Sequence, residues 1–407
     1  MPAITGSSDC VKPVSSIDRV KSRYGWPAAM SYGWRLRRDP GCNNRHSIVP
    51  ETRNSGSAPE MNFHEMTADA VKTQLENLQA ANSALPGDIV VSGPVHSNPH
   101  NAGLHPATRI FRGTSPSLPY VLAIKAIDTD SKPDAGLWFQ REAGVLEALH
   151  SKQDHAHTGL TACLHLADAN SGLLVTEWLK GRNLRKHFYL NMFSQSRRNK
   201  GITAAGKWLS RLHDSMGRDT IVFDTSEFVQ EIRNRISANS GDRRDRHLRY
   251  LDVLEAGVLK LAGEPNTASL QHGDFSPNNL VIANKKMDLR SFDFSNPQVA
   301  PVEIDIAHFL LNRTVRLEAG LKAGSGQNLW QQTPQWQAFS QGYFGGPDHP
   351  PGRWLTWHAL RTLLSKAPFL SLFSKDMSRT LIDRFDRRRE LHRVENLMAI
   401  LARDLEQ

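Results

Sequence analysis

The sequence predicts an α+β fold of two lobes, a small β-rich N-terminal lobe and a larger, mainly helical C-terminal lobe. Three observations support this prediction. A chain of 407 residues is long enough to form two hydrophobic cores. The strand-like runs "DIVV", "ATRIFR" and "YVLAIKAI" all lie in the first third of the chain. Beyond Gly181, apolar residues recur mainly at helical spacing, as in "AAGKWLSRLHD".

We divide the chain into residues 1–60, 61–180 and 181–407. The first segment is rich in Ser, Pro, Gly, Asn and Arg without periodicity, so we expect a disordered basic tail. Its cluster "WRLRRDPGCNNR" is expected to be solvated rather than bound to a membrane surface or nucleic acid. Residues 61–180 form the N-terminal lobe with a leading helix, and Met61 is a candidate for the true translation start. Residues 181–407 form the helical lobe.

Charge and cysteine content narrow the classes of function. A net charge of +9 and a pI near 9.5 favour an anionic partner or substrate, but no nucleic-acid recognition motif accompanies them. No apolar run reaches the ~20 residues that span a bilayer and no secretory signal opens the chain, so we expect a cytoplasmic protein, with peripheral membrane contact left open. Cys10, Cys42 and Cys163 are too far apart for a disulfide framework or a zinc site. We expect Cys163 to be a small buried apolar residue rather than a nucleophile.

A loop and a helix complete the expected N-terminal lobe. The loop "SGPVHSNPHNAGLHP" is expected between "DIVV" and "ATRIFR". We expect its histidines to be solvated rather than to bind a metal; they are His96, His100 and His105. The segment "GLWFQREAGVLEALH" predicts a helix, and Glu142 falls on its apolar face.

Lys125 and Glu142 are charged residues at apolar positions. Lys125 lies between Ala123 and Ile127 in a strand with two apolar faces, where an unpaired ammonium is costly. Glu142 has the same difficulty on its helix, so the two residues can pair. A strand lysine paired with a helix glutamate can direct an ammonium at the α and β phosphates of ATP. The alternative is a lysine that snorkels to solvent and an unrelated glutamate.

The stretch "QHGDFSPNNL" has an order of polar residues that a solvent loop does not need. Asp274 can act as a general base toward a hydroxyl group, and Asn279 can turn its amide oxygen to a magnesium ion. Pro277 stiffens the turn between them. Past a predicted hairpin, Asp293 stands between two phenylalanines in "SFDF", where its carboxylate needs a cation such as Mg²⁺. We expect His272 to pack under the loop and hydrogen-bond its backbone rather than to act as the base.

The order of these segments resembles a known superfamily. The segments are "VLAIK", "REAGVLEAL", "LLVTEWLKG", "WLSRLHD", "HGDFSPNNLV", "SFDF" and "EIDIAHFL". They resemble the aminoglycoside phosphotransferases and choline kinases, which share the protein-kinase fold, over about residues 85–312. The resemblance implies that Asp274 is the catalytic base, that Asn279 and Asp293 bind Mg²⁺, and that Lys125 with Glu142 orients ATP.

The resemblance also implies a nucleotide site in the N-terminal lobe. Backbone groups of "TEWL" would hold adenine at the hinge, which assigns this role to Glu177, Trp178 and Leu179. Ser92 and Gly93 would approach phosphate through backbone amides. Their loop departs from the compact Gly- and Ser-rich turn of relatives, because it is longer and interrupted by prolines and histidines. Asp305 in "DIAHFL" would brace the catalytic loop.

The sequence therefore predicts an ATP- and Mg²⁺-dependent kinase that phosphorylates a hydroxyl group of a sugar, an amino alcohol or an aminoglycoside-like acceptor. Basic clusters such as "RRDRHLR" follow the hinge and favour a neutral or anionic acceptor. A protein kinase is an alternative, but no "APE"-like segment lies between "SFDF" and "EIDIAHFL". A catalytically silent pseudokinase is a second alternative. Such proteins usually lack the catalytic base or a metal ligand, whereas this chain has Asp274, Asn279 and Asp293.

Six aromatic residues of the C-terminal part could wall a sugar or quaternary-ammonium pocket. They are Trp330, Trp336, Tyr343, Phe344, Trp354 and Trp357. We expect most of them to lie in the core. The sequence predicts no specific nucleic-acid partner and leaves the oligomeric state open.

Overall fold

The computed structural model describes most of the chain from Met66 onward. The described residues are 66–81, 85, 87–98, 107–128, 135–151, 159–222, 225–237, 242–295, 297–317, 330, 333–375 and 381–407. The chain divides into two units, Met1–Glu65 and Met66–Gln407, and every described residue belongs to the second. The predicted basic tail, Met61, Cys10 and Cys42 therefore lie outside the described residues.

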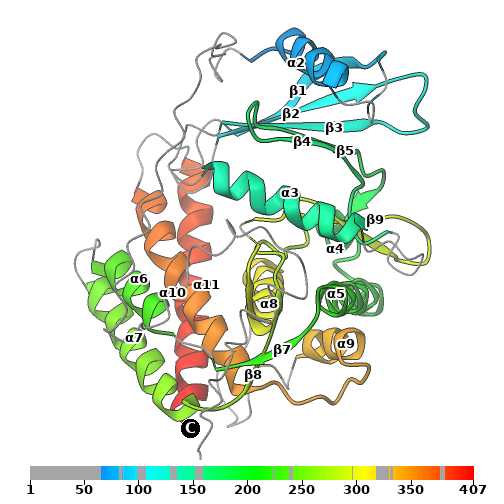
Figure 1. Cartoon of the computed structure of the whole chain (residues 1–407). Helices are drawn as coiled ribbons and strands as arrows, with labels where there is room; N and C mark the ends of the chain where they lie inside the picture. The colour runs from blue at the N-terminus through cyan, green and yellow to red at the C-terminus, as the bar shows by residue number, and fades with distance from the viewer. Residues whose placement is uncertain are drawn as a thin grey trace, which may run out of the picture. The chain divides into compact units, whose positions relative to one another are not determined.

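A five-stranded antiparallel sheet forms the N-terminal lobe, with strand order β1-β2-β3-β5-β4 (Figure 1). The strands are β1 (Val90–Asn98), β2 (Thr108–Thr114), β3 (Leu122–Ile127), β4 (Leu164–Asp168) and β5 (Leu173–Glu177). Helix α2 (Ala68–Ala81) packs against β1, and α3 (Ala135–Ser151) packs against β4. The predicted β-rich lobe with its leading helix is confirmed. The segment "LLVTEWLKG" forms β5 and the linker after it, whereas β4 was not predicted.

Strand β3 has one packed face and one open face. Leu122, Ile124 and Ala126 are fully buried. On the other face, Ala123 and Lys125 border a pocket rather than a packed core. A lysine fits within this apolar strand because its ammonium reaches the pocket.

The predicted loop at residues 92–106 begins as a strand, so that prediction is wrong at its start. Strand β1 continues to Asn98 and pairs with β2 on both sides of a register shift. Pro94 lies within the shift, where a strand tolerates a residue that donates no ladder hydrogen bond. His96 is exposed, and the described part of the chain holds no group of three or more His, Cys, Asp or Glu suited to a metal. Two histidines lie outside the described residues, His100 and His105.

Helices form most of the C-terminal lobe, as predicted (Figure 1). They are α4 (Leu184–Leu190), α5 (Gln195–Met216), α6 (Ser226–Ser237), α7 (Asp242–Leu261), α8 (Glu303–Leu317), α9 (Pro334–Tyr343), α10 (Arg353–Lys375) and α11 (Leu381–Glu406). No helix in the described ranges is both long and apolar enough to cross a bilayer. The cytoplasmic location stays a prediction.

Two small antiparallel sheets lie among these helices, with orders β10-β9-β6 and β11-β8-β7. Their strands are β6 (Arg182–Asn183), β7 (Asp219–Ile221), β8 (Asn266–Leu270), β9 (Leu280–Ile282), β10 (Leu289–Ser291) and β11 (Val299–Pro301). The β9–β10 pair is the hairpin that the sequence predicts. The other four strands were not predicted, because runs of two to five residues carry little periodicity.

Helix α5 packs through the apolar stripe that the sequence predicts. Its buried residues include Ala205, Trp208, Leu209 and Leu212. The helix crosses α9 closely at Gly206 and Gly342. A Cβ atom at either glycine would overlap backbone atoms of the other helix, so this crossing requires glycine at both positions.

The aromatic residues of the C-terminal part are mostly core residues, as expected. The buried ones are Trp330, Trp336, Tyr343, Trp354 and Trp357. Phe344 is the exception; it is 39% exposed and stacks on His349, with ring centroids 3.7 Å apart. The five buried residues therefore belong to the core of the lobe.

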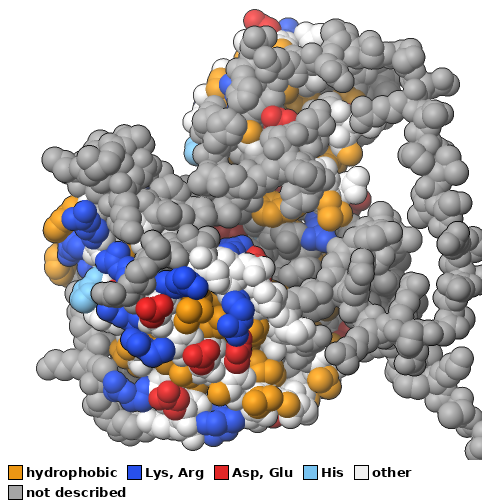
Figure 2. Space-filling view, turned by 90° about the vertical axis from the view of Figure 1, so that its left-hand side faces the viewer, with side chains coloured by type: hydrophobic (Ala, Val, Ile, Leu, Met, Phe, Trp, Pro, Cys, Tyr) orange, Lys and Arg blue, Asp and Glu red, His pale blue; other side chains and the backbone are white. Residues whose placement is uncertain are grey.

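The face of the C-terminal lobe that carries α6 and α7 mixes positive and negative side chains (Figure 2). Arg235 pairs with Glu231 on α6, and Arg233 pairs with Glu255 on α7. Interspersed charges of both signs keep a surface solvated without a strong field of one sign.

We expect His358→Phe to make the stability of the protein less dependent on pH. His358 is fully buried against the rings of Trp354 and Trp357, and burial holds its pKa well below the usual value. The folded protein keeps this imidazole neutral, whereas the unfolded chain binds a proton below about pH 6.5. Stability is therefore lost as pH falls below that value, at up to about 1.4 kcal/mol per pH unit for this residue.

Urea unfolding at a series of pH values from about 7.5 down to about 5 measures this effect. The variant should show a shallower loss of unfolding free energy, with the remaining slope due to other buried histidines such as His272. His392→Gln, an exposed site on α11, is the matched control. An unchanged slope in His358→Phe would contradict the prediction.

Candidate active site

The loop between β8 and β9 is fixed by hydrogen bonds to Asp305, which lies in the first turn of α8. The Asp305 carboxylate accepts hydrogen bonds from the backbone N–H groups of His272, at 2.7 Å, and Gly273, at 3.2 Å. Burial by itself raises the pKa of Asp305, but His213 and the loop outweigh it, so the pKa lies below its usual value. The bracing role predicted for Asp305 is confirmed.

His272 is a packing residue of this loop. Its ring is fully buried and stacks on Phe294, with centroids 4.5 Å apart. Its Nε2 lies 2.5 Å from the Ser291 hydroxyl, so its partner is a side chain of β10 rather than the loop backbone that we expected. Burial lowers the pKa of His272, which keeps the ring neutral. Because the His272 ring is buried, it cannot reach the hydroxyl group of a substrate, which supports a structural role for His272 rather than a role as catalytic base.

Asp274 is partly exposed and contacts two residues. Its carboxylate accepts a hydrogen bond from Nδ2 of Asn279 at 2.8 Å, and its other oxygen lies 3.7 Å from Nε2 of His308. Because Asn279 donates through its amide nitrogen, its amide oxygen stays an acceptor. Sequence analysis missed His308. Its i+3 spacing from Asp305 places both residues on one side of α8, but no local pattern connects it with Asp274.

Lys125 connects Glu142 and Asp293. Its Nζ lies 2.8 Å from Oε2 of Glu142 and 2.6 Å from Oδ1 of Asp293. Burial lowers the pKa of Lys125, but the two carboxylates outweigh this effect and raise the pKa above its usual value. The predicted pairing of Lys125 with Glu142 is confirmed. The cation expected beside Asp293 is, in this structure, the Lys125 ammonium.

Asp293 has an unusual backbone conformation. Its φ is 63°, in the left-handed region that residues other than glycine seldom adopt. Its side chain is 46% exposed and borders the same pocket as Lys125. Strained backbone at a pocket residue is a frequent mark of a functional site. The sequence does not reveal this conformation.

These residues border a pocket of about 630 Å³, a size typical of small-ligand sites. Its lining includes Lys125, Glu142 and Asp293, together with the hinge residues Glu177, Trp178 and Leu179. Asn278 lines the pocket, whereas Asn279 contacts Asp274. Ser92 and Gly93 belong to β1 and are outside the lining of this pocket.

Arg290 of β10 braces the hinge and was missed by the sequence analysis. Its guanidinium donates to the two carboxylate oxygens of Glu177, at 2.8 and 2.6 Å, and to the backbone oxygen of Thr161 at 2.7 Å. Burial by itself raises the pKa of Glu177, but the Arg290 bonds outweigh it and the pKa is lowered. The Glu177 side chain therefore joins the sheet of the N-terminal lobe to the β9–β10 hairpin.

The main chain of the hinge is partly used within the protein. The amide of Glu177 donates to the Cys163 carbonyl at 2.9 Å, and the amide of Trp178 donates to the Val121 carbonyl at 2.7 Å. Cys163 is half-buried rather than buried as expected, because it leads into β4 at the edge of the sheet. Leu179 follows these two residues and lines the pocket.

The sheet, the lysine–glutamate pair and the braced polar loop together define a protein-kinase-like fold. The chain belongs to the phosphotransferase enzyme family, whose model matches residues 98–339, more than half of the chain. The match includes Lys125, Asp274 and Asp293. The protein is a phosphotransferase.

Several solved structures share this fold at low sequence identity. A choline/ethanolamine kinase family protein from Mesorhizobium loti has a TM-score of 0.55 and 13% identity, covering 84% of this chain and 99% of that one. A putative aminoglycoside phosphotransferase from Ralstonia eutropha has a TM-score of 0.54 and 14% identity, covering 82% of this chain and 98% of that one. Choline kinase LicA from Streptococcus pneumoniae has a TM-score of 0.50 and 12% identity, covering 80% of this chain and 99% of that one. Comparison with curated protein sequences gives no match. The predicted superfamily and fold are confirmed.

Proposed function

We propose that this phosphotransferase is a small-molecule kinase that uses ATP and Mg²⁺. The observation that carries the proposal is the position of Lys125, held by Glu142 and Asp293 in a pocket bordered by the hinge. A cation fixed between two carboxylates in this way can be directed at phosphate groups. Asp274, on the braced loop, supplies a carboxylate for the acceptor.

In this proposal the adenine lies at the hinge. The amides of Glu177 and Trp178 already donate to backbone carbonyl groups of the N-terminal lobe, so Leu179 is our candidate for the main-chain contact. Ser92 and Gly93 stay predicted phosphate contacts. Gly93 has φ of 120°, which suits glycine where a backbone bends close to a ligand.

The oxygen atoms of Asp293 and Asn279 fit a magnesium ion. Mg²⁺ prefers one or two protein oxygens together with phosphate oxygens and waters. Asp293 offers a partly exposed carboxylate, and Asn279 keeps its amide oxygen as an acceptor. Bound Mg²⁺ would neutralise charge on the phosphates during transfer.

We assign Asp274 as the base that takes the proton of the acceptor hydroxyl. The hydroxyl oxygen then bonds to the γ-phosphorus of ATP while the bond to ADP breaks. Asn279 and His308 position the Asp274 carboxylate through the contacts at 2.8 and 3.7 Å. The basic sequence after the hinge supports a neutral or anionic acceptor, such as a sugar or a sugar phosphate, over a polycation.

The two alternative functions, a protein kinase and a catalytically silent pseudokinase, receive less support. Between Asp293 and Asp305 the described chain forms β11 and enters α8, which leaves little room for a peptide platform. A silent pseudokinase is disfavoured because Asp274, Asn279 and Asp293 are retained and Asp274 contacts Asn279.

We expect Asp274→Ala to lower ADP release by about 10²-fold or more with a productive acceptor, because general-base catalysis contributes about 10²- to 10⁴-fold. Alcohols, sugars, sugar phosphates and aminoglycosides form the panel. Mg-ATP affinity of the variant should stay near that of the wild type. Asp252→Ala, an exposed site on α7, is the matched control and should retain activity. Equal ADP release by wild type and Asp274→Ala, or no Mg²⁺-dependent ATP binding by wild type, would overturn the proposal.

A further inference from the structure

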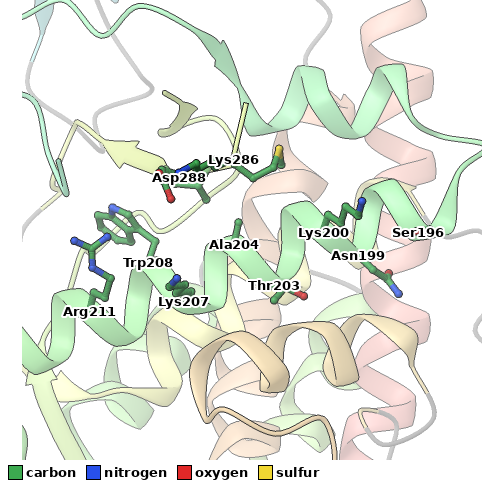
Figure 3. Close-up of a pocket in the computed structure, with 12 residues that line it drawn as sticks. Ser196, Asn199, Lys200, Thr203, Ala204, Lys207, Trp208, Arg211, Lys286 and Asp288 are labelled. Atoms are coloured by element: carbon green, nitrogen blue, oxygen red, sulfur yellow. The ribbon is translucent and has the colours of Figure 1, made fainter. Parts of the chain in front are cut away.

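A second pocket, of about 600 Å³, lies between α5 and the turn of the β9–β10 hairpin. On α5 its lining residues recur every three or four positions, as Ser196, Lys200, Ala204, Lys207 and Arg211 do. Figure 3 shows Lys286 and Asp288 of the hairpin turn opposite these side chains. None of these residues lines the pocket of Lys125 and Asp293.

The charge of this second pocket is strongly positive. Four cationic side chains line it, from Lys200, Lys207, Arg211 and Lys286, against one carboxylate, from Asp288. That carboxylate accepts a hydrogen bond from the Asn284 side chain at 2.7 Å. Lys200, Lys207 and Lys286 form no ion pair within the part of the chain that the structure describes. Their charge is therefore available to an anion.

This concentration of charge differs from the surface of α6 and α7. There, arginines such as Arg233 and Arg235 pair with glutamates. Side chains of both signs lie close together on that face (Figure 2). In the second pocket the lysines converge on a cavity instead, and like charges brought together repel one another unless an anion compensates them.

The spacing of the cations limits the shape of the ligand. Lys200 and Arg211 are eleven positions apart on α5, which corresponds to roughly 16 Å along the helix axis. A single phosphate ion is small compared with a groove of this length. A ligand that uses the whole groove needs anionic groups that are themselves separated.

We propose that this groove binds an extended small molecule that carries two or more phosphate groups. Lysine ammonium groups bind phosphate as point charges with freely turning donors, which suits an open groove. Trp208 forms part of the lining and stacks on Phe275, the residue after Asp274, with ring centroids 5.5 Å apart. The groove therefore contacts the loop of Asp274 through Trp208 and Phe275, and it is separate from the pocket proposed for the nucleotide.

Calorimetric titration with short linear inorganic polyphosphate tests the site. The titrations use the background Lys125→Met with Glu142→Leu. This background keeps the pocket proposed for ATP from contributing much to phosphate binding and leaves no buried charge unpaired. Lys200→Glu with Lys207→Glu should weaken binding of the probe by at least about tenfold. Orthophosphate should bind at least about tenfold more weakly than polyphosphate, since it cannot span the groove. Equal affinities for the two probes would contradict an extended ligand.

Two further variants separate a built site from general charge attraction. Arg244→Glu with Arg249→Glu makes the same change of charge at exposed positions of α7 and should leave binding unchanged. Ala204→Trp fills the groove without changing charge and should weaken binding about as much as the double lysine variant. Thermal unfolding confirms that each variant is folded. The proposal fails if the two lysine substitutions leave polyphosphate binding unchanged, or if the α7 control loses as much affinity as they do.

Discussion

Lys125→Met should abolish detectable phosphoryl transfer and also destabilise the protein. The variant removes the ammonium proposed to hold the ATP phosphates, and positioning with electrostatic stabilisation is nearly the whole of catalysis in phosphoryl transfer. It also leaves Glu142, which is 5% exposed, without its partner at 2.8 Å. Leaving one partner of a buried ion pair uncompensated costs about 3 to 5 kcal/mol.

The double variant Lys125→Met with Glu142→Leu separates these two effects. It should be as inactive as Lys125→Met, yet unfold at a temperature closer to that of the wild type, because no buried charge remains unpaired. Asp293 loses the same lysine in both variants, but its side chain is 46% exposed and water screens it.

Thermal unfolding and ADP release on Lys125→Met, Glu142→Leu and the double variant measure both effects. Lys285→Met, at an exposed position of the hairpin turn, is the matched control and should change neither property. Additive stability losses would show that Lys125 and Glu142 do not interact in solution. Full activity of Lys125→Met would remove the role assigned to this lysine.

Asp293→Ala should weaken Mg-ATP binding far more than Asp274→Ala does. Asp293 is the proposed metal ligand, whereas Asp274 acts on the acceptor and is placed by Asn279 and His308. Metal-mediated charge stabilisation contributes several kcal/mol, so Asp293→Ala should also lower transfer by about 10³-fold or more.

Calorimetry with ATP, with and without Mg²⁺, distinguishes the two roles. Asp293→Ala should lose the gain in ATP affinity that Mg²⁺ provides, and Asp274→Ala should keep it. Asp252→Ala again controls for the loss of one carboxylate at an exposed site. Wild-type Mg-ATP binding by Asp293→Ala would show that the metal assignment is wrong.

The parts of the site that local sequence shows were predictable. Lys125 and Glu142 were identified because each places a charge among apolar residues, and a buried charge needs a partner. The loop around Asp274 and the hairpin before Asp293 were identified from residue order within one short segment. Longer elements such as α3 and α5 were predicted because their apolar periodicity extends over several turns.

The partners that join distant segments were not predictable in the same way. Arg290 is far from Glu177 in the sequence, and His308 is far from Asp274, so no local pattern connects either pair. The continuation of β1 to Asn98 depends on hydrogen bonds to β2, which local composition with Gly and Pro does not reveal.

Residue type and local order were enough to predict the two-lobe α+β class, the superfamily resemblance, and Lys125, Asp274 and Asp293 as site candidates. The contact of Lys125 with both Glu142 and Asp293, and the φ of 63° at Asp293, became known only from the folded chain. The same is true of the groove that the α5 lysines line together with Lys286. Distances between residues far apart in the chain arise only when packing brings their elements together, and electrostatic interactions depend on those distances.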